Sequence, residues 1–246
     1  RSNIENAVSK GEKSVKALME LCRNGKGLEQ RDALVALFRI SSESAKGVAV
    51  ELLGSEDKVV QYAALTVCAR TRAREASEKS LDLTKSEDIL LRARAAKATG
   101  FLLGAEALLR LSQMLDDEAA YVRASAAETI EALTFMDFGL SHSGYASERE
   151  RAISKLKVWM ETHGTSSRFE WLEERMAGAI ADLSSNDPWT RYSSNAFIRR
   201  ILGPTPYSWE MSGQQRDNAI QQIRMKWQEY EPLFRTDVPL QLEMEL

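Results

Sequence analysis

Three short segments decide the fold, and they read DKVVQYAA (residues 57–64), DILLRARA (residues 88–95) and AAYVRASA (residues 119–126). Each segment has an apolar residue at its fourth position, and these residues, Val60, Leu91 and Val122, follow one another at intervals of 31 residues. A fixed period of this size is typical of stacked helical repeats, in which each unit buries its apolar face against its neighbours. The sequence therefore predicts an all-α fold, a right-handed α-α superhelix of antiparallel helix pairs.

Aspartates stand where the second helix of a pair would begin. A carboxylate there accepts hydrogen bonds from the unpaired N–H groups of the first turn, so Asp57, Asp88 and Asp187 are predicted helix caps. In the third segment Asp117 comes two residues too early, and Ala119 occupies the cap position. The apolar residue three positions after each cap lies on one helical face with an alanine four residues further on, and alanine lets a neighbouring helix approach closely.

These segments resemble the HEAT-repeat (HEAT-like, armadillo-type α-solenoid) family, in which an aspartate before the second helix and an arginine after its first valine form a ladder along the stack. Arg92, Arg123 and Arg191 match that arginine, whereas Gln61 departs from it. The resemblance covers most of residues 14–231 and implies that the arginines bond backbone or acidic groups between repeats. The ladder residues are then structural rather than catalytic.

The predicted organisation is a lead-in over 1–13, one HEAT-like repeat domain over 14–231, and a tail over 232–246. Within the domain, regular repeats are expected over 14–135 and extended repeats over 136–231. Each extended repeat contains a loop with glycine and aromatic residues, then a helix that carries a tryptophan. This unit is similar to the repeat-plus-tryptophan-helix arrangement of some bacterial HEAT-like proteins. Whether the loops 134–146 and 203–212 serve a function or only pack stays open.

The charge and hydropathy of the chain limit the kinds of partner and location that we expect. With a formal net charge of −3, a sequence-independent grip on the phosphate backbone of nucleic acid is not expected. No run reaches the length of a membrane span. A cytoplasmic location is favoured, but the chain begins at Arg1 rather than Met, so an exported form stays open.

The chain offers little that points to catalysis. Cys22 and Cys68 lie in apolar stretches and are interpreted as buried thiols, while His142 and His163 are interpreted as solvated or capping side chains. No metal-ligand spacing and no phosphate-binding glycine pattern stands out. We therefore expect no catalytic residue, no cofactor and no metal.

The expected binding residues lie on the outward positions of the second helices, which would form a concave face. They are Tyr62, Arg94, Lys97, Glu128, Glu131, Trp189, Tyr192, Asn195 and Arg199, and Thr66 shares the pattern. The basic cluster around Arg70 and Arg92 is interpreted mainly as helix-end and ladder cations, with a patch for an acidic partner as the alternative. For Trp189, packing and recognition are equally balanced, whereas Trp159 and Trp227 are expected to pack.

Two function classes follow. The first is a non-catalytic protein–protein interaction scaffold or adaptor that presents a concave helical surface to a protein or peptide, because solenoid faces usually bind proteins and the signs of charge are mixed. The alternative is a HEAT-like enzyme such as an alkylpurine DNA glycosylase, although the basic excess of a DNA-binding groove is missing. A bilin-lyase-type helper has no positive support in the sequence.

Overall fold

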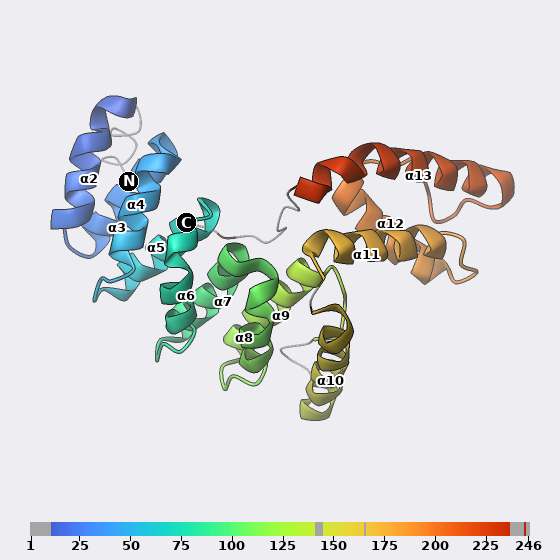
Figure 1. Ribbon diagram of the computed structural model, residues 1–246, viewed down its shortest axis with the longest axis horizontal. Helices are drawn as coiled ribbons and strands as arrows, with labels where there is room; N and C mark the ends of the chain where they lie inside the picture. Colours follow the sequence, from blue (N-terminus) through green and yellow to red (C-terminus); the bar gives the residue numbers. More distant parts are fainter. Residues whose placement is uncertain (1–10, 141–144, 165, 237–243, 245–246) are drawn as a thin grey trace. The chain divides into compact units, whose positions relative to one another are not determined.

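The computed structural model describes residues 11–140, 145–164, 166–236 and 244, and every regular element in them is a helix (Figure 1). This confirms the predicted all-α solenoid class, while the hand of the superhelix stays a prediction. The chain divides into two compact units. Unit 1 contains residues 1–133, 137–161 and 241–246, and unit 2 contains residues 134–136 and 162–240, each as far as the structure describes it.

Unit 1 consists of antiparallel helix pairs that follow one another along the stack (Figure 1). The first helices of the pairs are α2 (Val15–Asn24), α4 (Ser42–Leu52), α6 (Ser77–Leu83) and α8 (Leu108–Met114). The second helices are α3 (Leu28–Ile40), α5 (Lys58–Arg70), α7 (Ile89–Leu103) and α9 (Ala120–Thr134). Single turns of 3-10 helix precede α2, α6 and α8, at Gly11–Ser14, Arg74–Ala76 and Gly104–Ala107.

The second helices of unit 1 are buried over most of their surface. The predicted core positions Val60, Leu91 and Val122 are almost fully buried, as are Ala64 and Ala95 one turn further on. α5 packs against α3, α4 and α7, so its side chains meet neighbours on several sides. Alanine at these crossings keeps the helices close, which is why the 31-residue pattern alternates large and small residues.

Phe138 of the first aromatic loop packs against α10 (Ala146–His163), which belongs to unit 1 except for its last two residues. The buried Phe138 ring meets Trp159 edge-on at a centroid distance of 5.6 Å, and α10 buries Ala152, Ile153 and Leu156. This contact confirms the packing interpretation of Trp159. Part of the loop, including His142, lies outside the described residues.

Unit 2 contains one further helix pair and a long closing helix: α11 (Arg168–Asp182), α12 (Pro188–Leu202) and α13 (Gly213–Thr236). Ser167 and Glu170 form a reciprocal capping box at the start of α11. α13 continues through Pro232, so residues 232–236 of the expected tail are helical. The expected single repeat domain over 14–231 stays a prediction.

Candidate binding surface

The three predicted aspartate caps are confirmed. Asp57 accepts the N–H of Val59 at 2.8 Å, and Asp88 accepts the N–H of Leu91 at 3.0 Å. Asp187 begins α12 in the same way, accepting two backbone N–H groups and the hydroxyl of Thr190. Hydrogen bonds from the Leu91 N–H and Lys58 lower the pKa of Asp88 against the opposing effect of desolvation. The carboxylate of each aspartate therefore determines the residue at which the second helix of its pair begins.

Arg92 connects two repeats through an almost buried ion pair. Its Nε and Nη2 each donate to a carboxylate oxygen of Asp117 at 3.0 Å, while its Nη1 donates to the carbonyl oxygens of Ser86 and Glu87. Asp117 also accepts the N–H of Ala119 at 2.8 Å. Desolvation raises the pKa of Asp117, but the hydrogen bonds from Arg92 and Ala119 outweigh it, and the pKa is lowered. The aspartate that stands two residues early is therefore the partner of the preceding repeat's arginine.

Arg123 and Arg191 make the same hydrogen bonds to the preceding turn as Arg92 does. In all three ladder arginines Nη1 donates to the two carbonyl oxygens that lie five and six residues earlier, in the turn before the helix. The acceptor of the other guanidinium nitrogens differs, because Nε and Nη2 of Arg191 both donate to the carbonyl oxygen of Trp209 at 3.1 Å. All three arginines thus bond backbone carbonyls as predicted, and Arg92 confirms the expected bond between repeats, whereas Arg191 bonds the loop after its own helix instead.

Glutamine occupies the arginine position in the earlier repeats. Gln61 donates from Nε2 to the carbonyl oxygen of Leu53 at 3.1 Å, and Gln30 donates to Cys22 at 2.8 Å. Both acceptors lie eight residues earlier in the sequence. The interval from Gln30 to Gln61 is again 31 residues, so the period extended one repeat further back than the three segments indicated.

Four of the expected binding residues of unit 1 form two pairs across neighbouring helices. The Arg94 guanidinium lies over the Tyr62 ring, with 4.1 Å from its Cζ to the centroid, and also donates to the Tyr62 hydroxyl. Lys97 on α7 pairs with Glu128 on α9, with 2.6 Å between Nζ and Oε2. Glu131 lies half-buried one turn further along α9. The outward side chains of α5, α7 and α9 are therefore held in a fixed arrangement by mutual contacts.

In unit 2 the expected residues separate into exposed and buried ones. Trp189 is 72% exposed and stacks on Tyr192 at a centroid distance of 5.5 Å, and Arg199 is also exposed. Asn195 is buried, and its amide oxygen accepts the hydroxyl of Thr205 at 3.1 Å. The expected outward orientation of Asn195 is wrong because the 203–212 loop covers it.

Thr66 is a second position for which the expected outward orientation is wrong. It is fully buried, and its hydroxyl donates to the carbonyl oxygen of Tyr62 in the preceding turn of α5. α5 is enclosed by neighbours, so only its N-terminal turn and its last residues reach solvent on this stripe.

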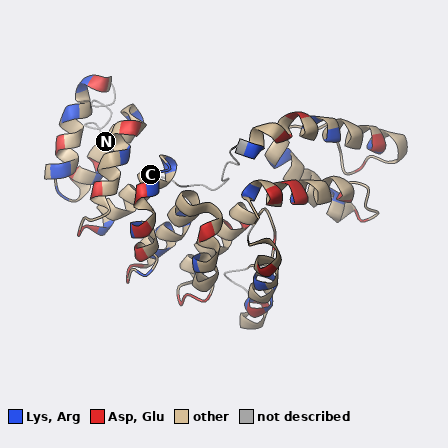
Figure 2. Ribbon diagram, in the orientation of Figure 1, with Lys and Arg blue, Asp and Glu red and all other residues tan. Residues whose placement is uncertain are grey.

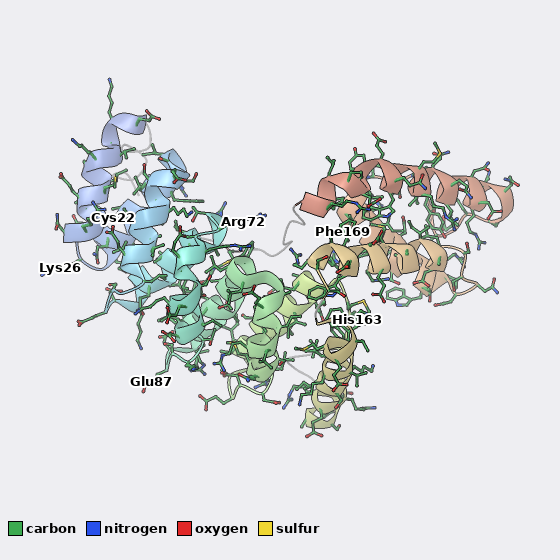
Figure 3. All side chains as sticks on the ribbon, viewed as in Figure 1. Cys22, Lys26, Arg72, Glu87, His163 and Phe169 are labelled. Atoms are coloured by element: carbon green, nitrogen blue, oxygen red, sulfur yellow. The ribbon has the colours of Figure 1, made fainter. Side chains whose placement is uncertain are left out.

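The sulfur and imidazole groups have structural positions. Cys22 and Cys68 are free thiols, and burial raises the pKa of each to about 12. His163 ends α10, where its Nε2 lies 3.2 Å from a carboxylate oxygen of Glu174 and its carbonyl accepts the indole N–H of Trp171 (Figure 3). Across the described ranges, no three His, Cys, Asp or Glu side chains gather as metal ligands would.

Basic and acidic residues are both distributed over the helices of each unit (Figure 2). Within the basic cluster singled out in the sequence, Arg70 lies over the Phe38 ring at 5.0 Å, and Arg92, Arg94 and Lys97 have the partners given above. Arg70, at the end of α5, and the ladder residue Arg92 fit the interpretation as helix-end and ladder cations, whereas Arg94 and Lys97 lie inside α7. None of the described helices combines the length and apolarity that crossing a membrane requires.

Comparison with known proteins agrees with this geometry. Residues 45–131, from α4 to most of α9, match the family description of HEAT repeats. No curated protein matches the chain. The match covers the two clearest 31-residue intervals, the aspartate caps of α5 and α7 and the Arg92–Asp117 pair. The resemblance seen in the sequence is therefore confirmed over residues 45–131, which match HEAT repeats.

Proposed function

We propose that the protein is a non-catalytic scaffold or adaptor that binds another protein on the face formed by its second helices. HEAT repeats generally mediate protein interactions, because stacked helix pairs present an extended surface in place of a single pocket. In unit 1 this face consists of the outward side of α3, α5, α7 and α9. Its expected concavity is part of the proposal.

The observation that carries the proposal is that the cations Arg94 and Lys97 of this face already have partners within the fold. Arg94 is held over Tyr62, and Lys97 is neutralised by Glu128. A face built to hold a polyanion would present unneutralised cations instead. Paired charges of both signs beside a tyrosine favour the patterned, mixed surface of a protein partner.

Unit 2 contributes a second group of candidate contacts. Trp189 and Tyr192 form an exposed aromatic stack at the start of α12, and aromatic anchors of this kind often dominate binding energy at protein interfaces. Arg199 and, in unit 1, Glu131 complete the proposed binding residues. Asn195 takes no direct part, because it is buried under its own loop.

The test compares capture of partners by charge-swapped variants. The wild-type chain, the single variants Lys97→Glu and Glu128→Lys, and the double swap serve as baits in the native lysate, with captured proteins identified by mass spectrometry. The double swap restores an ion pair and keeps the helix packing, so its denaturation midpoint should match the wild type. We expect it still to lose the captured partner, because the order of charges on the face is reversed.

A matched control lies on a first helix. Leu109→Lys changes an exposed residue of α8 and should leave capture unchanged. If the double swap retained the full set of captured proteins at wild-type yield, the second-helix face would not be the binding face.

A further inference from the structure

At the start of every second helix of unit 1, the same repeat position carries an exposed apolar side chain. These side chains are Leu28 (60% exposed), Val59 (43%), Leu90 (58%) and Tyr121 (54%). Each follows the previous one by 31 residues, the period of the repeat itself. Single exposed apolar residues are ordinary on protein surfaces, but the same exposed position in four consecutive repeats is a continuous feature of the stack. We call these four residues the apolar row.

The apolar row belongs to the proposed binding face. Tyr62 stands three residues after Val59, and Arg94 and Lys97 stand four and seven residues after Leu90. On each helix, these intervals place the member of the apolar row and the binding residues on the same stripe. α3, α5 and α7 pack in succession, and the Lys97–Glu128 contact joins α7 to α9, so the row continues from one helix to the next.

A row of glutamates runs beside it. Glu56, Glu87 and Glu118 are each exposed and each stand three residues before a member of the apolar row, in the turns that precede α5, α7 and α9. Figure 3 shows Glu87 in the turn before α7, at the edge of unit 1. The Glu118 side chain is 86% exposed despite its contact with Arg92 at 3.5 Å. We call these three residues the glutamate row.

Two cations close to the glutamate row, Lys58 and Arg92, are paired mainly with aspartates. Lys58 lies 3.6 Å from a carboxylate oxygen of Asp88, and the guanidinium of Arg92 is committed to Asp117. Within the part of the chain that the structure describes, Glu56 and Glu87 have no ion pair. Their charge is therefore available to an incoming partner.

We propose that the apolar row and the glutamate row together bind a basic amphipathic α-helix of a partner protein. This inference rests on the proposed scaffold function and names its partner class. The partner's apolar stripe would cover the row, and its lysines or arginines would meet the glutamates. Complementary charge beside an apolar contact fixes both the orientation and the register of a bound helix.

The spacing of the two rows fits a helix. Packed neighbouring helices lie about 8–10 Å apart, so the members of each row follow one another at about that distance. Seven residues of α-helix rise about 10.5 Å, so apolar residues at every seventh position keep step with the row. An extended strand, which turns its side chains to alternate faces and rises about 3.3 Å per residue, does not match this step.

The experiment titrates the full chain with a labelled synthetic peptide of about 20 residues, a length that spans the row when helical. The peptide has leucine at every seventh position, lysines and arginines beside that stripe, and alanine elsewhere. Fluorescence anisotropy should show saturable binding that weakens as salt is raised, and the peptide should gain helical circular dichroism when bound. A matched peptide with glutamates in place of the basic residues should bind at least about tenfold more weakly.

Two variants separate the contributions of the rows. Leu90→Ser/Tyr121→Ser alters only exposed side chains and should weaken binding by about tenfold or more at every salt concentration. Glu87→Gln/Glu118→Gln should weaken it mainly at low salt. Leu109→Ser, equally exposed but on a first helix, is the control and should bind as the wild type does.

Failure of this inference and failure of the proposed function give different results. Absence of saturable binding, equal binding of the acidic peptide, binding without gain of helix, or unchanged binding by Leu90→Ser/Tyr121→Ser would each overturn the basic-helix proposal. So would self-association of the chain that Leu90→Ser/Tyr121→Ser abolishes, since a second copy would then occupy the row. The scaffold proposal would survive all of these if the Lys97/Glu128 double swap still lost the captured partner.

Discussion

Arg92 in unit 1 and Arg191 in unit 2 hold the same repeat position, yet they are completed by different acceptors. Both bond the two carbonyl oxygens of the preceding turn. Arg92 then finds the carboxylate of Asp117 in the next repeat, whereas Arg191 finds the carbonyl oxygen of Trp209 in the loop that follows its own helix. A regular stack supplies the second acceptor from its next member, and a repeat that is followed by a long loop takes it from the loop.

The difference explains why the 203–212 loop is ordered around α12. Tyr207 in this loop is buried, and its hydroxyl donates to the carbonyl oxygen of Leu183 at 2.8 Å. Together with the Arg191 contact and the Thr205–Asn195 bond, this bond holds the loop against the helix pair of unit 2. The loop thus substitutes for a neighbouring repeat at this position of unit 2, and packing is at least part of its role.

The largest effect is expected from Arg92→Ala. The change leaves the Asp117 carboxylate and two turn carbonyls without their donor, and breaking one side of a nearly buried ion pair costs about 3 kcal/mol of the free energy of unfolding. Urea denaturation followed by circular dichroism measures it. Arg123→Ala should cost less, because Arg123 is only half-buried whereas Arg92 is buried, so water can replace more of the lost hydrogen bonds. Equal losses for the two variants would contradict the special weight given to the Arg92–Asp117 pair.

Arg191→Ala should destabilise unit 2 by about 2 kcal/mol, because two carbonyl groups of the turn and one of the loop lose their donor. Tryptophan fluorescence is the suitable probe, since Trp171, Trp189, Trp209 and Trp227 belong to unit 2 and only Trp159 to unit 1. Hydrogen exchange should accelerate at the amides of the 203–212 loop. Unchanged exchange there would show that the bonds of Tyr207 to Leu183 and of Thr205 to Asn195 order the loop without Arg191.

The regular repeats could be predicted from the sequence because their signal is local. Caps at Asp57 and Asp88 and core positions such as Leu91 depend on residues within one turn of each other, and a fixed period repeats that signal. The partner of Arg92 could not be predicted in the same way. Asp117 stands two residues before the position that the cap spacing predicts. Only the structure shows that two turns from different repeats approach each other, so that Asp117 at this position pairs with Arg92.

The candidate surface was predicted less well, for a related reason. Thr66 and Asn195 satisfy the helical spacing of outward residues, but burial depends on which elements cover them: the flanking helices in one case and the 203–212 loop in the other. The apolar row was present in the sequence as a 31-residue interval, from Leu28 to Tyr121. It could be interpreted as a binding surface only after the structure showed that all four side chains are exposed.

Acid should destabilise the repeats through Asp88 and Asp117. Hydrogen bonds hold the pKa of Asp88 below its usual value in the folded chain, and the pKa of Asp117 is lowered despite desolvation. Their stabilisation is complete above the unfolded pKa of about 3.9 and is lost as pH falls through the lower folded values. Urea midpoints measured from neutral pH downward should therefore drop below about pH 4.

Asp88→Ala tests the same carboxylate at neutral pH. Loss of the cap at the start of α7 should cost about 1 kcal/mol, and the remaining acid sensitivity should be smaller than in the wild type. Asp117→Asn, which keeps the shape but removes the charge, should flatten the acid limb further. An acid limb that neither variant alters would assign the pH dependence to other carboxylates.

The smallest effect on stability is expected at Trp189, the position that corresponds in unit 2 to the apolar row of unit 1. Like Val59 and Leu90, it stands two residues after its aspartate cap, and it is the most exposed of the three. Trp189→Ala should change the free energy of unfolding by no more than about 0.5 kcal/mol, because little buried surface is lost beyond the stack on Tyr192.

Partner affinity should respond differently from stability at this position. If the start of the second helix is a contact in both units, Trp189→Ala should weaken binding of the captured partner by at least about tenfold, and Trp189→Phe should retain most of it. Denaturation midpoint and affinity measured on the same preparations separate the two quantities. Full affinity in Trp189→Ala, with lost affinity in Leu90→Ser/Tyr121→Ser, would confine the binding face to unit 1 and leave the aromatic stack of α12 a surface feature without a contact.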